Sequence, residues 1–228
     1  MDLTYKKQLA EFFNCNYERS FDKKILNGNF TDHKEIIAYI LHIVNIPISE
    51  FIEYISSYGK TQAIMASDVF QFSDFDDATT DLCSALESIG NPGVKFKQVA
   101  QLLLTDNVQR NDVALSKYGE NHIKTAECLG LSFKDTSKNY YLSAVGCVFN
   151  DLNPEEKEKL LIRLILRYKL FTQLLMAALQ GEFELEVFLY DLSKSTYLRR
   201  RTNINRVIEI LNNSAEYNFA NITKNINY

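Results

Sequence analysis

The segment from Asn153 to about Leu179 constrains the fold most, because a well-defined helix start leads into residues that are apolar on almost every side. Asn153 precedes Pro154, and two glutamates follow in the first turn, an order typical of a helix N-terminus. One helical face carries Leu161, Leu164, Ile165, Tyr168, Leu175 and Leu179, and other positions carry Leu160, Ile162, Leu166, Leu170 and Met176. Such a helix is buried on more than one side, so we expect it to separate two modules or to form a dimer contact.

The composition is that of an ordered globular protein with one or two cores. The 228 residues are 46% apolar, a usual share for a folded chain. Only 8 Gly and 3 Pro are present, against 13 Tyr and 15 Phe, so long irregular segments are not expected.

Several features predict a cytoplasmic protein without a membrane segment. The first residues, MDLTYKKQLAEFF, lack the apolar region and the cleavage site of a secretory signal. The longest apolar stretch, residues 160–179, contains Arg163, Arg167, Lys169 and Gln173, which a lipid-facing helix would not tolerate. Four widely spaced cysteines without a C-x-x-C pair are expected to be reduced and buried, not to bind a metal: Cys15, Cys83, Cys128 and Cys147.

Residues 81–152 carry the pattern of three short helices followed by a β-hairpin. The first helix ends at Gly90, before Asn-Pro-Gly. Apolar residues at helical spacing mark the next two: Phe96, Val99, Ala100 and Leu103, then Ile123, Ala126 and Leu129. The following run, LSFKDTSKNYYLSAVG, indicates a strand, a polar turn and a second strand. This order of elements predicts a winged-helix module.

Residues 183–213 predict a second helix-turn-helix, with a short helix, a turn at Ser193 and Lys194, and a longer helix capped by Ser195. On a helical wheel one face carries Tyr197, Ile204, Ile208 and Leu211, and the opposite face carries Ser195, Arg199, Thr202 and Arg206, with Asn203 beside them. We expect the first face to pack and the second to contact DNA. The residues after Asn213 are polar and are expected to form a frayed tail.

Two groups of residues are candidates for contacts with DNA. Between Lys194 and Arg206 the chain has five basic residues and no acidic one, and the mixture with Ser, Thr and Asn suits contacts to phosphates and base edges. The candidates in this helix are Lys194, Ser195, Thr196, Arg199, Arg200, Thr202, Asn203 and Arg206. A second surface is expected from KYGENHIK, where Lys117, Asn121, Lys124 and Thr125 would face the groove.

Charge is distributed unevenly along the chain, although the net charge is only −4. Residues 1–90 carry 7 Lys and Arg against 14 Asp and Glu, whereas residues 91–228 carry 18 against 15. Because phosphate contacts depend on local basic patches, the acidic total does not exclude DNA as a partner.

One catalytic hypothesis stays open. Asp74, Asp76, Asp77 and Asp81 lie close together in the sequence, and such carboxylates could bind the magnesium ion of a nuclease. We favour a charged loop and helix start there, because no Glu-x-Lys partner follows. His122 has no Ser, Cys or acidic neighbour placed for catalysis, so we expect it to be buried or to cap a helix. The sequence therefore predicts no catalytic residue, no metal and no cofactor.

Two strings resemble a known family of modules. They are ALxxIGNPG, from Ala85 to Gly93, and RNDVALSKYGENHIKxAxxLGL, from Arg110 to Leu131. These strings resemble the winged-helix modules attached to type II restriction-modification proteins, and Ser195, Thr196, Arg199, Arg200 and Thr202 resemble their second helix-turn-helix. The resemblance covers roughly residues 80–212 and implies tandem DNA-recognition modules. It implies that catalysis belongs to a separate nuclease or methyltransferase domain, and residues 1–80 show no such domain.

We therefore predict a mainly α protein with small β-wings, in which tandem helix-turn-helix or winged-helix modules are joined by a long buried helix. The expected parts are an acidic N-terminal helical region (1–80), a winged-helix module (81–152), a long helix with a second helix-turn-helix (153–213) and a polar tail (214–228). The expected function is double-stranded DNA binding for sequence recognition in a restriction-modification or related defence system. The protein partner would be a second copy or a restriction-modification protein. The alternatives are a winged-helix transcriptional regulator and a divergent magnesium-dependent type II restriction endonuclease, and the sequence favours a protein that is not an enzyme.

Overall fold

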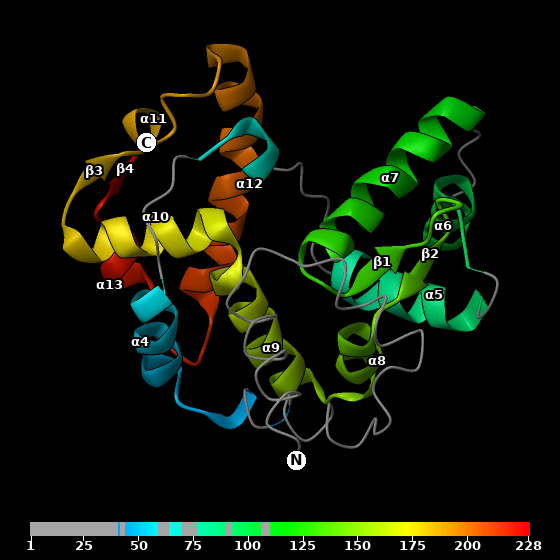
Figure 1. Ribbon diagram of the computed structural model, residues 1–228, viewed down its shortest axis with the longest axis horizontal. Helices are drawn as coiled ribbons and strands as arrows, with labels where there is room; N and C mark the ends of the chain where they lie inside the picture. Colours follow the sequence, from blue (N-terminus) through cyan, green and yellow to red (C-terminus); the bar gives the residue numbers. More distant parts are fainter. Residues whose placement is uncertain (1–40, 42–43, 59–63, 70–76, 90–92, 106–109) are drawn as a thin grey trace. The chain divides into compact units, whose positions relative to one another are not determined.

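The computed structural model describes residues 41, 44–58, 64–69, 77–89, 93–105 and 110–228. These residues fall into two compact units. The first contains the described residues between 77 and 153, and the second contains those between 41 and 69 together with 154–228. In each unit, helices predominate and two short strands pair (Figure 1).

The first unit contains three helices, an antiparallel hairpin and a fourth helix, after a one-turn π-helix, η2 (Asp77–Asp81). The elements are α5 (Leu82–Ile89), α6 (Phe96–Leu103), α7 (Asp112–Cys128), β1 (Ser132–Lys134), β2 (Tyr140–Leu142) and α8 (Ala144–Asp151). Three helices are thus followed by a small antiparallel sheet, as the periodicity and the turn residues predict.

A third extended segment joins this hairpin. Val94, just before α6, forms an antiparallel bridge with Tyr140, and the two residues exchange backbone hydrogen bonds of 3.0 and 2.8 Å. β2 therefore lies between β1 and Val94. The rings of Phe96 and Tyr140 stack with their centroids 5.2 Å apart, which ties the start of α6 to the hairpin.

α6 and α7 approach each other closely at Gly119. A Cβ atom at this position would lie 1.9 Å from the carbonyl oxygen of Phe96, so any larger residue would force the two backbones apart. Asn111 caps the start of α7, because its side chain accepts a 2.8 Å hydrogen bond from the Ala114 backbone N–H. The close contact and the buried Ile123 and Ala126 decide which side of α7 faces solvent.

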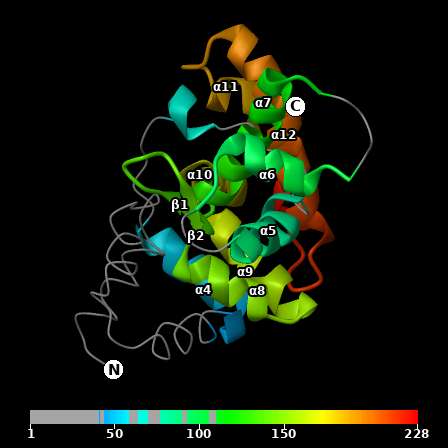
Figure 2. The same ribbon diagram turned by 90° about the vertical axis from the view of Figure 1, so that its right-hand side faces the viewer.

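One carboxylate organises the turn between β1 and β2. Asp135 accepts hydrogen bonds from the backbone and side-chain N–H groups of Asn139, at 2.9 and 3.2 Å, and from the Tyr141 hydroxyl at 3.2 Å. The backbone hydrogen bond from Asn139 is the main cause that lowers the pKa of Asp135. Lys138 takes the positive φ of 63° at the end of the turn. The turn extends away from the helices of its unit (Figure 2).

The second unit is built around α9, α10 and α12. Its elements are α4 (Ile48–Tyr58), the single 3₁₀ turn η1 (Ala66–Asp68), α9 (Pro154–Arg167), α10 (Lys169–Gln180), β3 (Phe183–Glu184), α11 (Leu185–Phe188), α12 (Lys194–Asn213), α13 (Ala220–Thr223) and β4 (Ile226–Asn227). α4 packs on α9 and α10, and α13 packs on α10 and α12. α4 begins directly after Pro47.

The predicted single long helix is wrong, because the segment folds as two helices. α9 ends at Arg167, Tyr168 is extended with φ −66° and ψ 128°, and α10 then runs in a different direction (Figure 1). No Gly or Pro marks this break. The Thr172 hydroxyl donates to the backbone carbonyl of Leu166, so a side chain of α10 satisfies a carbonyl at the end of α9.

Arg163 is completely buried, and among the described residues it is the largest of the fully buried side chains. Its Nη1 and Nη2 atoms donate to the two carboxylate oxygens of Glu216 at 2.7 and 2.6 Å. Nη2 also donates to the carbonyl of Ile46 at 2.6 Å, and Nη1 donates to that of Lys159 at 3.0 Å. A buried guanidinium needs such partners, so Arg163 joins α9 to the chain before α4 and to the chain after α12.

The C-terminal residues are ordered, and the expectation of a frayed tail is wrong. β4 pairs in parallel with β3, and Phe219, at the start of α13, is fully buried. Polar side chains of this segment make specific contacts. The Asn225 side-chain amide donates to the Ala178 carbonyl at 2.9 Å, and the Thr223 hydroxyl donates to the Asn212 side chain at 2.7 Å.

The protein is therefore mainly α with small β elements, which confirms that part of the predicted fold class. In the described part of the chain no helix combines the length and the apolar character that a membrane span requires. Most of the predicted acidic N-terminal region, including Cys15, lies outside the described residues.

Candidate nucleic-acid interface

α12 begins earlier than the sequence suggested. Its cap is Ser193, whose hydroxyl oxygen accepts a hydrogen bond from the Thr196 backbone N–H at 3.3 Å. Ser195, the predicted cap, lies inside the first turn, and its side chain is exposed. The backbone turns helical at Lys194, so only Ser193 has the extended geometry of a cap.

α12 has the two faces that the helical wheel predicts. The buried residues are Tyr197, Ile204, Val207, Ile208 and Leu211. The exposed residues up to Arg206 are Lys194, Ser195, Leu198, Arg199, Arg201, Thr202 and Arg206. The structure describes this helix throughout, and no acidic residue occurs in it before Glu209. Its exposed face is therefore basic and rich in hydrogen-bond donors.

The exposed arginines are held only by weak contacts. Arg199 Nε donates to the Ser195 carbonyl at 3.2 Å, and the Arg201 guanidinium lies 6.0 Å from the centre of the Tyr197 ring. Arg206 Nη1 lies 3.4 Å from a carboxylate oxygen of Glu209, and both side chains are more than half exposed. Exposed pairs of this kind contribute little to stability, so these cations can exchange their contacts for those of a ligand.

Three of the predicted contact residues are partly covered by the protein. Thr196, Arg200 and Asn203 are each half-buried. Burial is the main cause that lowers the pKa of Arg200, and the neighbouring Arg199 adds to it. Arg200 Nε and Nη1 are shielded from solvent and have no hydrogen-bond partner among the described residues. Arg200 therefore does not share the open face of Arg199 and Arg206.

The second candidate surface, on α7, is smaller than predicted. Lys117 and Lys124 are exposed and Asn121 is half-buried, but Thr125 is fully buried. The Thr125 hydroxyl donates to the Asn121 carbonyl at 3.0 Å, on the side of α7 that packs. The predicted groove contact of Thr125 is therefore wrong.

Glu120, which the sequence did not single out, links the two lysines of this surface. Its Oε1 atom lies 2.5 Å from Lys124 Nζ, and its Oε2 atom lies 2.9 Å from Lys117 Nζ. The hydrogen bond from Lys124, followed by that from Lys117, lowers the pKa of Glu120, so the carboxylate is charged at neutral pH. The i,i+3 and i,i+4 spacing was the signal that could have found this cluster.

Two basic residues of the hairpin were also missed. Lys138 is exposed at the turn, and Lys134 is half-buried at the end of β1. The sequence predicts the turn from its local hydrogen-bonding residues, but it does not show that the turn extends from the unit (Figure 2).

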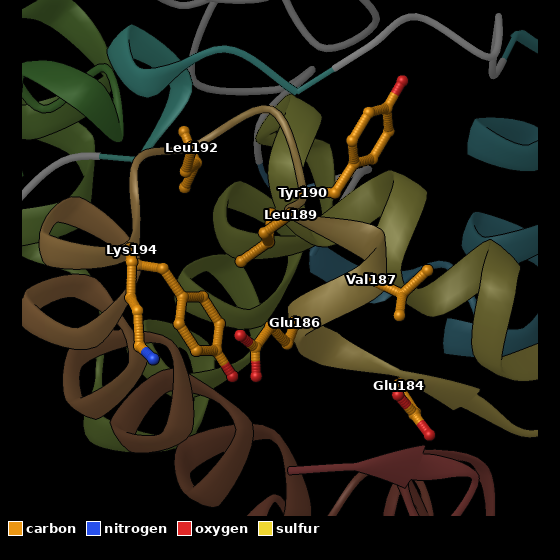
Figure 3. A pocket seen from close by; sticks show the side chains of 8 residues that line it. Glu184, Glu186, Val187, Leu189, Tyr190, Leu192 and Lys194 are labelled. Carbon is orange, nitrogen blue, oxygen red and sulfur yellow. The ribbon is translucent and has the colours of Figure 1, made fainter.

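A hollow of about 370 Å³ lies beside the first turn of α12. It is lined by Glu184, Glu186, Val187, Leu189, Tyr190, Leu192, Lys194 and Tyr197. Figure 3 shows Glu184 and Glu186 on the β3–α11 side of this hollow and Lys194 on the α12 side. Because carboxylates repel phosphates, this hollow does not suit a polyanion. Arg199 and Arg206 are not among its lining residues.

The described residues do not assemble a recognisable catalytic centre. His122 is buried, and its ring centre lies 4.4 Å from that of Tyr118. Asp74 and Asp76, the carboxylates of the nuclease hypothesis, lie outside the described residues, and Asp77 and Asp81 are the two ends of η2. Within the described ranges, no group of three His, Cys, Asp or Glu side chains could hold a metal ion. Cys83, Cys128 and Cys147 are free thiols; Cys83 is buried as expected, Cys128 is half-buried, and Cys147 is exposed, so the expected burial is wrong for Cys147.

No protein-family model, no curated protein and no solved structure matches the chain. The functional conclusion therefore depends on the charge and hydrogen-bonding geometry of α12, α7 and the β1–β2 hairpin.

Proposed function

We propose that the chain binds double-stranded DNA and that α12 contributes the main contact surface. The observation that carries this proposal is the exposed face of α12, where Arg199 and Arg206 are accompanied by Ser195 and Thr202 and by no acidic residue of the helix before Glu209. Arginine and lysine bind phosphates, and arginine also recognises guanine in the major groove, which admits an α-helix. Packing of Tyr197, Ile204 and Ile208 keeps the opposite face against the protein.

We interpret the first unit as a winged-helix module. Its support is the order of elements: α5, the extended segment at Val94, α6, α7 and a hairpin whose second strand pairs with Val94. α6 lies against α7 through Gly119, which gives α7 a rigid support and leaves Lys117 and Lys124 in solvent. In such a module α7 would enter a groove and the hairpin, with Lys138, would contact the adjacent backbone.

We further propose that binding serves sequence recognition in a restriction-modification or related defence system. The support for this step is the resemblance of residues 80–212 to the modules of those proteins. The same arrangement would serve a transcriptional regulator equally well. Identification of the preferred DNA site and of the protein partner would separate these roles.

The direct test is binding of fluorescent duplex DNA of random sequence by the purified chain over a range of salt concentrations. We expect the logarithm of the binding constant to fall linearly with the logarithm of salt concentration, with a slope of about −0.9 for each phosphate neutralised. The double variant Arg199→Ala, Arg206→Ala should bind more weakly and show a shallower slope. The matched control removes one exposed cation from α13's C-terminal end, Lys224→Ala, and should bind like the unaltered chain.

The proposal fails if the unaltered chain shows no salt-dependent binding, or if Lys224→Ala weakens binding as much as the double arginine variant. Thermal melting of each variant shows whether folding is preserved. A parallel incubation with magnesium tests the nuclease alternative, because cleavage of the duplex by the pure chain would show that this is an enzyme.

A further inference from the structure

We infer that Glu120 of α7 selects a base, by accepting a hydrogen bond from the exocyclic amino group of a cytosine in the major groove. This role rests on the proposed DNA binding. On this surface the carboxylate of Glu120, and not the neighbouring lysines, would then discriminate between base pairs.

Glu120 lies on the side of α7 that reaches solvent, next to the packed side, and its side chain is 22% exposed. Val113, Lys117, Glu120 and Lys124 recur at helical spacing along one side, and Val113 is 79% exposed. The opposite side is fixed by the buried residues Gly119, Ile123 and Ala126. A helix that presents this side to DNA therefore presents the Glu120 carboxylate with it.

The carboxylate retains acceptor capacity in this arrangement. Each of its oxygens receives one lysine N–H, at 2.5 Å from Lys124 and 2.9 Å from Lys117, whereas a carboxylate offers about four acceptor positions in all. The two lysines hold the side chain in place and keep it ionised, so it accepts hydrogen bonds and donates none. Each ammonium group also has further N–H donors for guanine or phosphate oxygens.

The two lysines explain how a carboxylate can approach a polyanion. An isolated Glu would be repelled by the phosphates on both sides of the groove, but two flanking cations give the cluster a net positive charge. Once in the groove, the carboxylate meets acceptors on guanine and on the O4 of thymine, and it meets the N4 amino donor on cytosine. The pairing with cytosine is therefore favourable, and the pairing with guanine or thymine at the same position is repulsive.

Space for a base edge exists beside this cluster. An open hollow of about 440 Å³ between α6 and α7 is lined by Phe96, Asp112, Val113, Ser116, Lys117 and Glu120. Asp112, the other carboxylate there, lies 2.8 Å from Lys97 Nζ. Glu120 is thus the carboxylate of this surface that is held between Lys117 and Lys124.

The test is selection of bound sites from a randomised duplex pool by the full chain and by variants. The unaltered chain should show one position with a preference for cytosine. E120Q, whose amide both accepts and donates, should reduce that preference about tenfold, which corresponds to about 1.4 kcal/mol and to the loss of one base contact. The matched control is Glu155→Gln on α9, which also removes a carboxylate that pairs with a lysine four residues away and should leave every base preference unchanged.

A second variant separates the effect of charge from that of hydrogen bonding. Glu120→Asp keeps the charge and shortens the side chain, so it too should lower the cytosine preference, and thermal melting should show both variants folded. Unchanged base preference in both variants, with DNA binding intact, would overturn the role of Glu120 and leave the proposed function standing. Absence of DNA binding by the unaltered chain would overturn both.

Discussion

Replacement of Arg163 should destabilise the second unit more than replacement of any surface cation. The side chain is completely buried and makes four hydrogen bonds, two of them to the carboxylate of Glu216. Arg163→Ala leaves Glu216, itself only 16% exposed, without its cation and leaves the Ile46 carbonyl without a donor. Loss of one partner from a buried ion pair costs about 3–5 kcal/mol, because the remaining charge stays desolvated.

The expected magnitude is large enough to measure by melting or by denaturant titration. For a chain of this size, 1 kcal/mol corresponds to about 2–4 °C, so the melting temperature of Arg163→Ala should fall by about 10 °C. The control is Arg206→Ala, whose ion pair with Glu209 is exposed and should change stability by less than about 1 kcal/mol. Added salt should have little effect on the difference, since a buried pair is weakly screened.

The double variant Arg163→Met, Glu216→Leu tests the cause of the loss. If the unpaired carboxylate is what destabilises Arg163→Ala, removal of both charges should recover much of the stability. Recovery should be incomplete, because the Ile46 carbonyl still lacks a donor, at about 1–3 kcal/mol. A change of less than about 1 kcal/mol in Arg163→Ala would refute the reasoning, because it would mean that the pair is not buried in solution.

Three further changes test the fold at other points. Gly119→Ala should lower the unfolding free energy by about 1–3 kcal/mol or more in a denaturant titration, because a Cβ atom would overlap the Phe96 carbonyl, and unaltered stability would contradict the close contact. Phe219→Ala should cost about 3–5 kcal/mol if the C-terminal residues belong to the core, and a near-neutral result would show that they do not. Because the folded-state pKa of Asp135 is lowered, its contribution to the hairpin is complete above the ordinary carboxyl pKa and is lost as the pH falls through the lowered value. An NMR titration of Tyr141 should follow that loss, whereas Asp135→Ala should show no such transition.

Local patterns in the sequence were sufficient for α5, α6 and α7 and for the turn of the first unit, but not for α8, whose first residues were interpreted as strand. The i,i+3,i+4 spacing in Phe96, Val99 and Ala100 reflects burial on one side, which is a local property of a helix. The turn was predictable because Asp135 and Asn139 satisfy each other within five residues. The two faces of α12 followed from the wheel for the same reason, since the apolar stripe and the basic stripe lie on one continuous helix.

Features that depend on distant partners were not predictable. The break at Tyr168 contains no residue that ends helices by itself, and it follows from packing and from the Thr172 hydroxyl. Arg163 was interpreted only as a charge that excludes a membrane span, because its partner Glu216 is 53 residues away in the sequence. The C-terminal asparagines suggested a solvated tail, but Asn225 bonds to Ala178, 47 residues earlier.

In the candidate interface, too, some features were predictable from local sequence patterns and others depended on packing that only the structure shows. Arg199 and Arg206 were correctly expected on the exposed side, because position on a regular helix determines exposure once the packed face is known. Thr125 was misplaced by the same argument, since only the structure reveals that α7 packs around Gly119 and turns Thr125 inward. Glu120 was overlooked because a carboxylate on a helix that is expected to contact DNA counts against binding until its two lysine partners are seen.

The cations of the two candidate surfaces differ in the partners that hold them. In the proposed complex with DNA, this difference would give α12 a role in affinity and α7 a role in sequence selectivity. On α12 the arginines have only weak partners, so in the proposed complex they would attract phosphates at long range and determine the salt dependence of binding. On α7, Lys117 and Lys124 share one carboxylate, which reduces their attraction for phosphates and places a charged acceptor between them. Loss of Arg199 should therefore lower affinity for all sequences, whereas loss of the Glu120 charge should raise affinity by freeing two lysines and lower selectivity. A lower affinity after loss of Arg199, together with a higher affinity after loss of the Glu120 charge, would show that α12 provides binding strength and that α7 provides sequence selectivity.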